Sequence, residues 1–88
     1  MEIPEELARN YLRRRLEDID HLEKALMVHD FEICQEIGHR LKGSARTFGF
    51  EDLEELASAL EDDAANEDEI SLAQDVDEFK LWVNKYIN

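Results

Sequence analysis

A histidine surrounded by cations is the residue in this sequence best placed to do chemistry. His39 lies in the stretch from Gly38 to Thr47, which contains cations and no acid. At about 100° of rotation per residue, its imidazole lies roughly 160° from Leu41, the centre of an apolar helical stripe, and so faces solvent. A solvent-facing imidazole beside cations is suited to carry a phosphoryl group, because the ring is a nucleophile and the cations balance phosphate charge. The cations are Arg40, Lys42 and Arg46.

The other side chains on this face of the helix leave room for a partner. Lys42 lies one turn after His39, and Gln35 and Arg46 fall on the same side. Gly43 also lies there, and its lack of a side chain leaves bare backbone beside the imidazole. A macromolecular partner is therefore expected to approach closely. The expected partner-contact residues are Gln35, Arg40, Gly43 and Arg46.

The rest of the sequence is patterned as helix. Apolar residues recur at intervals of three and four positions, and few prolines or glycines interrupt them. Asp30 is expected to cap the second helix, and Gly49 to end it in the left-handed conformation. Ser71 followed by Gln74 is typical of a capping box for the fourth helix, with the polar stretch 62–69 as a flexible loop before it. The predicted helices cover about residues 4–28, 31–48, 51–64 and 71–87.

Amphipathic helices joined by short connections predict an all-α fold, an antiparallel up-down four-helix bundle. A length of 88 residues suits a single domain over residues 1–88. The apolar stripes turned inward are enough to fill the interior, so we expect a monomer. In the first helix the stripe consists of Ala8, Leu12, Leu16, Ile19, Leu22 and Leu26.

Charge and composition narrow the partners and the compartment. The net charge of -13, from 23 acids against 10 bases, repels nucleic-acid phosphates and anionic lipid, so neither nucleic acid nor membrane is an expected partner. No apolar run approaches the ~18 residues of a membrane span, and the acidic residues 1–6 lack the cationic start of a signal peptide. The lone Cys34 cannot form an internal disulfide. These features predict a cytoplasmic protein.

The motif around the histidine resembles a known family. The residues His39-Arg40-Leu41-Lys42-Gly43-Ser44-Ala45, followed by Phe48-Gly49 and later by Leu60-Glu61, are similar to the histidine-containing phosphotransfer (HPt) domain of bacterial multistep phosphorelays. The core motif His-x-Leu-Lys-Gly is short. Its register within a four-helix pattern of this length makes it fairly specific, and the resemblance covers nearly the whole chain.

The resemblance implies a role for each motif residue. His39 would accept a phosphoryl group from a receiver-domain aspartate and pass it to another receiver, in response regulators or hybrid histidine kinases. Lys42 would steady the phosphoryl group, and Gly43 would admit the partner. Glu61 matches a glutamate or glutamine near the imidazole, where it would accept a hydrogen bond from one ring nitrogen. Gly38 stands where alanine is common in the family, and we expect this small difference to be neutral.

The sequence contains no Gly-rich phosphate loop and no ATP site, so we expect a phosphohistidine carrier rather than an autonomous enzyme. No cofactor is expected on the chain itself, and the Mg²⁺ that in-line phosphoryl transfer requires is expected on the receiver. The partner proteins decide which receivers donate and accept the phosphoryl group. They also decide in which direction the phosphoryl group flows and which output it controls.

Three other interpretations compete with the carrier. The first is a four-helix docking module that binds a receiver or helical partner without phosphotransfer. The second is the dimerisation helix pair of a sensor kinase, but the residues after His39 lack the acidic neighbour and the proline typical of that motif. The third is a metal site built from His21, His29 and His39, whose spacing does not place two imidazoles on one helix face. We therefore predict no metal site.

Overall fold

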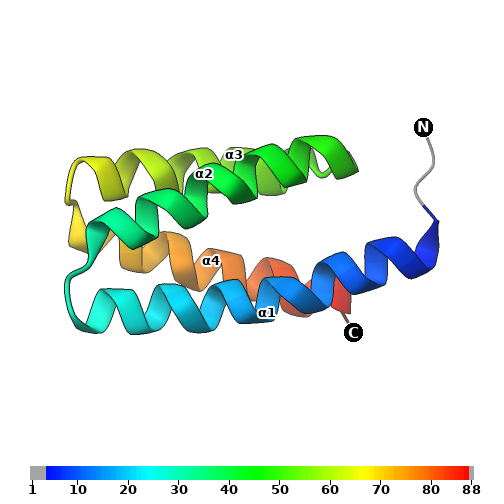
Figure 1. Cartoon of the computed structure of the whole chain (residues 1–88), viewed down its shortest axis with the longest axis horizontal. Coiled ribbons are helices and arrows are strands. Elements are labelled where there is room, and N and C mark those ends of the chain that lie inside the picture. Colours follow the sequence, from blue (N-terminus) through cyan, green and yellow to red (C-terminus); the bar gives the residue numbers. More distant parts are fainter. Residues whose placement is uncertain (1–3, 88) are drawn as a thin grey trace.

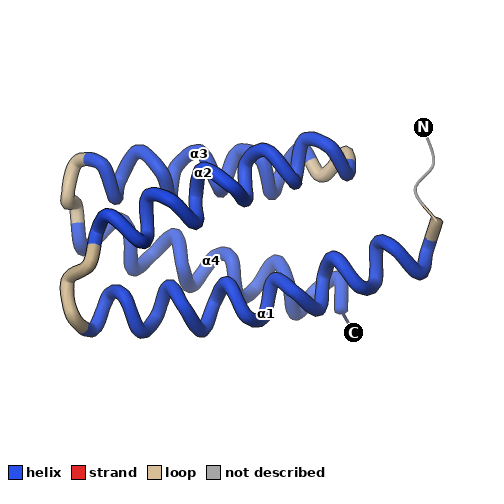
Figure 2. Tube along the Cα trace, viewed as in Figure 1, coloured by secondary structure: helices blue, strands red, loops and turns tan. Residues whose placement is uncertain are grey.

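The computed structural model describes residues 4–87, and these residues contain α-helices and loops but no strand. Residues 1–3, part of the acidic start examined above, and residue 88 lie outside the described range. Figure 1 shows the α1–α2 and α3–α4 loops at one end of the molecule and the α2–α3 loop at the other. The prediction of an all-helical chain is confirmed, and Figure 2 shows how short the loops are. The helices are α1 (Glu5–Met27), α2 (Phe31–Phe48), α3 (Glu51–Ala65) and α4 (Glu69–Ile87).

The helices pack around one hydrophobic core. Contacts join α1 to α2, α2 to α3, α3 to α4 and α1 to α4, so each helix has two neighbours. All four helices contribute fully buried side chains, which are the apolar residues that the three- and four-residue spacing placed on one face. The largest are Leu22, Leu41, Leu53, Leu60, Leu72, Phe79 and Val83.

The ends of α2 have the signals that the sequence predicted. The Asp30 carboxylate accepts a hydrogen bond of 3.2 Å from the backbone N–H of Ile33, which satisfies a donor that the first turn leaves free. Gly49 follows the helix with φ 78°, in the left-handed region that glycine enters without a Cβ penalty. Both predictions are confirmed. Because only Gly49 and Phe50 separate α2 from α3, the two helices form a tight hairpin.

The start of α4 differs from the prediction. The Asp68 carboxylate accepts a hydrogen bond of 3.2 Å from the backbone N–H of Ser71, and the helix begins at Glu69. Ser71 is therefore inside the first turn, and the predicted cap at that residue is wrong. The predicted flexible loop is also too long, because burial of Ala64 against the core keeps α3 helical to Ala65. Only residues 66–68 connect the two helices.

The buried face of α1 is rotated from the predicted stripe. Leu16 is 45% exposed, whereas Tyr11, which the prediction left out, is 5% exposed. The Tyr11 ring stacks on Phe48 with 4.4 Å between ring centroids, and its hydroxyl lies 2.8 Å from Ser44 Oγ. A tyrosine can be buried in this way because its polar end finds a partner. The predicted inward position of Leu16 is wrong because α1 packs against both α2 and α4, which turns a different face of the helix inward. The buried residues of α1 are Tyr11, Leu12, Ile19, Leu22 and Ala25.

One carboxyl group is buried between helices. Asp75 of α4 is 8% exposed, and its Oδ2 has no hydrogen-bond partner among the described residues. Burial, and after it the neighbouring Asp63 carboxyl on α3, together raise the pKa of Asp75 to about 8. The folded state therefore binds a proton here that the unfolded chain, with an ordinary value of 3.8, has released at neutral pH.

We expect Asp75→Asn to stabilise the fold at alkaline pH. The folded-state pKa of Asp75 is above its unfolded value, so the free energy of unfolding falls as pH rises from the unfolded value of 3.8 to about 8. Asparagine cannot ionise, so the variant avoids this loss, with a gain of about 2 kcal/mol above pH 8. Thermal unfolding of both proteins at matched pH values measures the gain. A difference in Tm that is the same at pH 4 and pH 9 would contradict the prediction.

Candidate functional site

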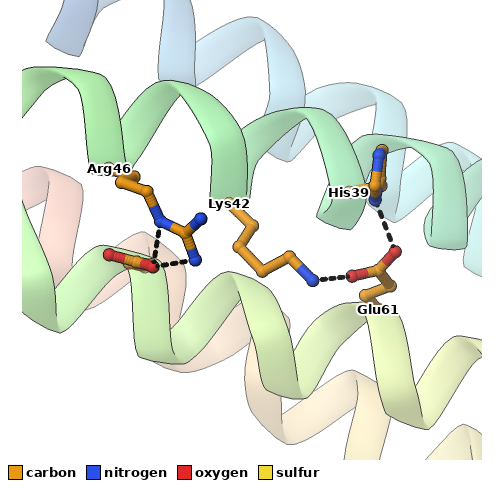
Figure 3. Close-up of polar contacts among 5 residues, drawn as sticks. His39, Lys42, Arg46 and Glu61 are labelled. Carbon is orange, nitrogen blue, oxygen red and sulfur yellow. Dashed lines mark hydrogen bonds and ion pairs between the residues drawn. The ribbon is translucent and has the colours of Figure 1, made fainter.

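His39 lies on the outer face of α2, where its side chain is 71% exposed. Its Nδ1 is 2.7 Å from Oε2 of Glu61 on α3 (Figure 3). Because a carboxylate can only accept, this contact places a proton on Nδ1, and in the neutral ring it leaves Nε2 with a free lone pair. The nitrogen that keeps its lone pair is the nucleophilic one.

Glu61 has a second contact, with Lys42. The Lys42 ammonium donates a hydrogen bond of 2.6 Å to Oε1, so each carboxylate oxygen has its own partner on α2. The Lys42 hydrogen bond lowers the pKa of Glu61 most, the His39 hydrogen bond lowers it further, and partial burial opposes both. Glu61 is therefore a carboxylate near neutral pH. Figure 3 shows it between His39 and Lys42, which lie one turn apart on the same helix.

Arg46, a predicted partner-contact residue, is exposed and also pairs with α3. Its Nε donates a hydrogen bond of 2.7 Å to Glu54 Oε2 on α3, and its Nη2 forms an ion pair with the same oxygen at 2.7 Å. The pair lies one turn beyond Lys42, toward the α2–α3 loop (Figure 3). The Arg46 side chain is still 72% exposed, so the guanidinium adds positive charge to this flank while remaining attached to α3.

The other predicted partner-contact residues lie around the imidazole. Gln35 and Arg40 line a shallow hollow of about 340 Å³ together with His39 and Glu61. Gly43 is exposed, and a Cβ built on it would meet nothing within 4 Å. A side chain at Gly43 would therefore project into the space above the helix that a partner must enter. The structure brings together His39, Lys42 and Glu61 by direct contact and places Gln35, Arg40 and Gly43 around them.

A second polar cluster lies between α1 and α2, and sequence reasoning expected Arg15 to pair with nearby acids but missed the burial of this cluster. The Arg15 guanidinium lies 4.0 Å above the Tyr11 ring, and it donates a hydrogen bond of 3.2 Å to Ser44 Oγ. Arg15 Nε is 3.1 Å from Asp18 Oδ2. Burial raises the pKa of Asp18, and Arg15 and Arg40 oppose that rise. The three-residue spacing of Arg15 and Asp18 was the available signal, but their burial depends on how α1 packs on α2.

The other histidines are not part of the site. Neither His21 nor His29 hydrogen-bonds to the His39–Glu61 pair, and His29 Nδ1 lies 2.9 Å from Glu69 Oε1 at the loop end of the bundle. Within residues 4–87, no three histidine, cysteine, aspartate or glutamate side chains gather so as to hold a metal ion. The geometry therefore supplies one outward imidazole, one ammonium and one carboxylate.

An exposed imidazole held by a carboxylate on a helical fold is the arrangement expected of the class of phosphotransfer modules that carry a phosphoryl group on histidine. The family model for the Hpt domain matches residues 6–86. The chain therefore belongs to the Hpt domain family, and membership implies a phosphocarrier role with receiver domains as partners. No curated protein and no solved structure matches the chain. Among the described residues, every helix is too short or too polar to cross a membrane.

Proposed function

We propose that His39 accepts a phosphoryl group from the aspartate of one receiver domain and passes it to the aspartate of another. The observation that supports this most directly is the exposed imidazole whose Nδ1 is bound to Glu61, which leaves Nε2 free to react. We propose that the site is carried by an antiparallel up-down four-helix bundle, which the positions of the loops in Figure 1 support. The carrier is expected to act as a monomer in the cytoplasm.

The transfer step needs no proton to move. The Nε2 lone pair attacks the phosphorus of the receiver's aspartyl phosphate, the bond from phosphorus to the carboxyl oxygen breaks, and the aspartate leaves as a carboxylate. The phosphorylated ring keeps its proton on Nδ1 and gains positive charge, which the Glu61 carboxylate stabilises across the 2.7 Å contact. Transfer to the next receiver reverses these steps.

Lys42 and the receiver each neutralise part of the phosphate charge. Lys42 is one turn from His39, and its flexible chain can move its ammonium from Glu61 to an oxygen of the phosphoryl group. The Mg²⁺ that in-line transfer requires is proposed to be the receiver's, because no set of metal-ligating side chains gathers in the described part of this chain. The proposed docking surface consists of Gln35, Arg40, Gly43 and Arg46.

A phosphoryl-transfer assay tests the proposal. The protein is mixed with Mg²⁺ and a panel of pre-phosphorylated receiver domains, and the products are mapped by mass spectrometry under non-acidic conditions. We expect an acid-labile, base-stable adduct on His39, and its loss when an unphosphorylated second receiver is added. If a receiver binds but none leaves an adduct on this chain, the protein is a docking module and the carrier proposal is wrong.

A further inference from the structure

The glycine directly before the reactive histidine is packed against the helix that carries Glu61. Gly38 is buried on α2, on the side that faces α3. A Cβ built on Gly38 would lie 2.8 Å from the backbone nitrogen of Glu61, 3.1 Å from its Cα and 3.2 Å from its Cβ. Real Cβ atoms essentially never approach another atom within 3.0 Å, so α2 and α3 are closer here than any other residue at this position permits.

The atoms that Gly38 approaches decide what a larger residue would do. They belong to the backbone of α3 and to the base of the Glu61 side chain, so none of them can swing away by a change of rotamer. A methyl group at Gly38 must therefore move the α2 and α3 backbones apart at Glu61. Gly43, in the same helix, has nothing within 4 Å of its Cβ position, so it provides a matched comparison.

We propose that Gly38 is a positioning residue, whose missing side chain sets the α2–α3 spacing at which Glu61 reaches His39 and Lys42 at the same time. The inference rests on the proposed role of His39 as the phosphoryl carrier. It also argues against the expectation that alanine would be equivalent to Gly38 in this chain. A glycine inside a helix is less favourable for helix stability than alanine. The close approach of α2 and α3 is the gain that offsets this cost at Gly38.

Both contacts of Glu61 depend on this spacing. The distances are 2.7 Å to His39 Nδ1 and 2.6 Å to Lys42 Nζ, and both carboxylate oxygens are used. A displacement of the α3 backbone carries the carboxylate with it, and the His39 contact has the least room to adjust because the imidazole is rigid. The hydrogen bond at Nδ1 selects the ring tautomer. If it is lost, the proton can move to Nε2, and Nε2 then has no lone pair with which to attack.

The test uses the Gly38→Ala variant of the whole chain and needs no receiver. Imidazole ¹⁵N shifts report the tautomer of His39, and a ¹³C titration of the Glu61 side-chain carboxyl reports its pKa. We expect Gly38→Ala to raise the fraction of the Nε2–H tautomer and to raise the lowered pKa of Glu61 toward its ordinary value. Gly43→Ala is expected to leave both readouts as in the wild type, because it touches nothing near Glu61.

A double variant tests whether Gly38 acts through Glu61. In a Glu61→Ala background, which lacks any acceptor for Nδ1–H, adding Gly38→Ala is expected to change the His39 tautomer no further. With a receiver that phosphorylates the wild type, Gly38→Ala is expected to slow transfer by roughly 3- to 10-fold when Glu61 is present, and adding it to the Glu61→Ala background is expected to cause no further loss.

The inference is wrong if a folded Gly38→Ala variant shows the same imidazole ¹⁵N shifts and the same Glu61 pKa as the wild type. If that variant does not fold, Glu61→Asp provides a second test, because it shortens the reach of the same carboxylate without touching Gly38. The tautomer must then shift in the same direction, and an unchanged tautomer would also overturn the inference. Because these spectra are recorded without a receiver, failure of the carrier proposal in the transfer assay remains a separate result.

Discussion

Replacing His39 with glutamine is expected to abolish phosphoryl transfer while leaving the fold intact. The amide of glutamine has the size and polarity of the imidazole but no nucleophilic nitrogen, so no adduct can form. The His39 side chain is 71% exposed, and substitutions at such positions change stability by about 0.5 kcal/mol or less. Transfer from a phosphorylated receiver, followed by mass spectrometry, measures the first effect, and thermal unfolding measures the second.

The other two histidines provide the control. His21→Gln and His29→Gln are expected to transfer phosphate at the wild-type rate, because neither side chain hydrogen-bonds or forms an ion pair with His39 or Glu61. A phosphoryl adduct that persists in His39→Gln and disappears in one of these variants would place the reactive histidine elsewhere and contradict the assignment.

Lys42→Ala is expected to slow phosphoryl transfer by roughly 100-fold, which is typical for the loss of a positioned charge that stabilises a transition state. The variant removes the ammonium that lies one turn from His39 and leaves the imidazole and its contact with Glu61 in place. It also removes the largest influence on Glu61, so the pKa of that carboxyl is expected to rise toward its ordinary value. Single-turnover transfer kinetics and a carboxyl ¹³C titration measure the two effects.

A variant of a distant lysine serves as the control that distinguishes the local effect of Lys42 from the loss of one positive charge. Lys80 of α4 donates a hydrogen bond of 3.1 Å to Glu23 of α1, outside the contacts of the site. Lys80→Ala is expected to leave the transfer rate within about twofold of the wild type, since charges beyond a Debye length of about 8 Å are largely screened at physiological ionic strength. An equal slowing by Lys42→Ala and Lys80→Ala would show that Lys42 acts only through net charge.

The helices were predictable because their determinants are local. The carboxylate of Asp30 and the left-handed Gly49 define the ends of α2 through neighbours only a few residues away, and both predictions are confirmed. The start of α4 was not predicted, because Asp68 and Ser71 are both capping residue types and the burial of Ala64 decides how far α3 continues. Burial of that kind depends on how the helices pack.

The sequence predicted which residues form the site but not how their side chains are arranged. His39 and Lys42 are a turn apart on one helix, so their common face follows from helical periodicity. Glu61 lies 22 residues after His39, and only the resemblance to a family pointed to it. A glycine inside a helix, such as Gly38, indicates close packing on a neighbouring helix, but the sequence does not place that contact at Glu61. The buried carboxyl of Asp75 left no signal in the sequence, because its burial depends on where another helix lies. The roles of these residues in transfer remain predictions.

The connection between α2 and α3 has a consequence for the order in which the molecule assembles. His39, Lys42 and Glu61 all lie on these two helices, which only Gly49 and Phe50 separate. The contacts that make the site join residues 19 and 22 positions apart, and the two-residue connection between the helices limits the chain entropy that closing them costs. The reactive centre is thus a local product of one helical hairpin. Fraying at the outer ends of α1 or α4 would leave its atoms in register, so the chemistry is protected from the first openings of the native state.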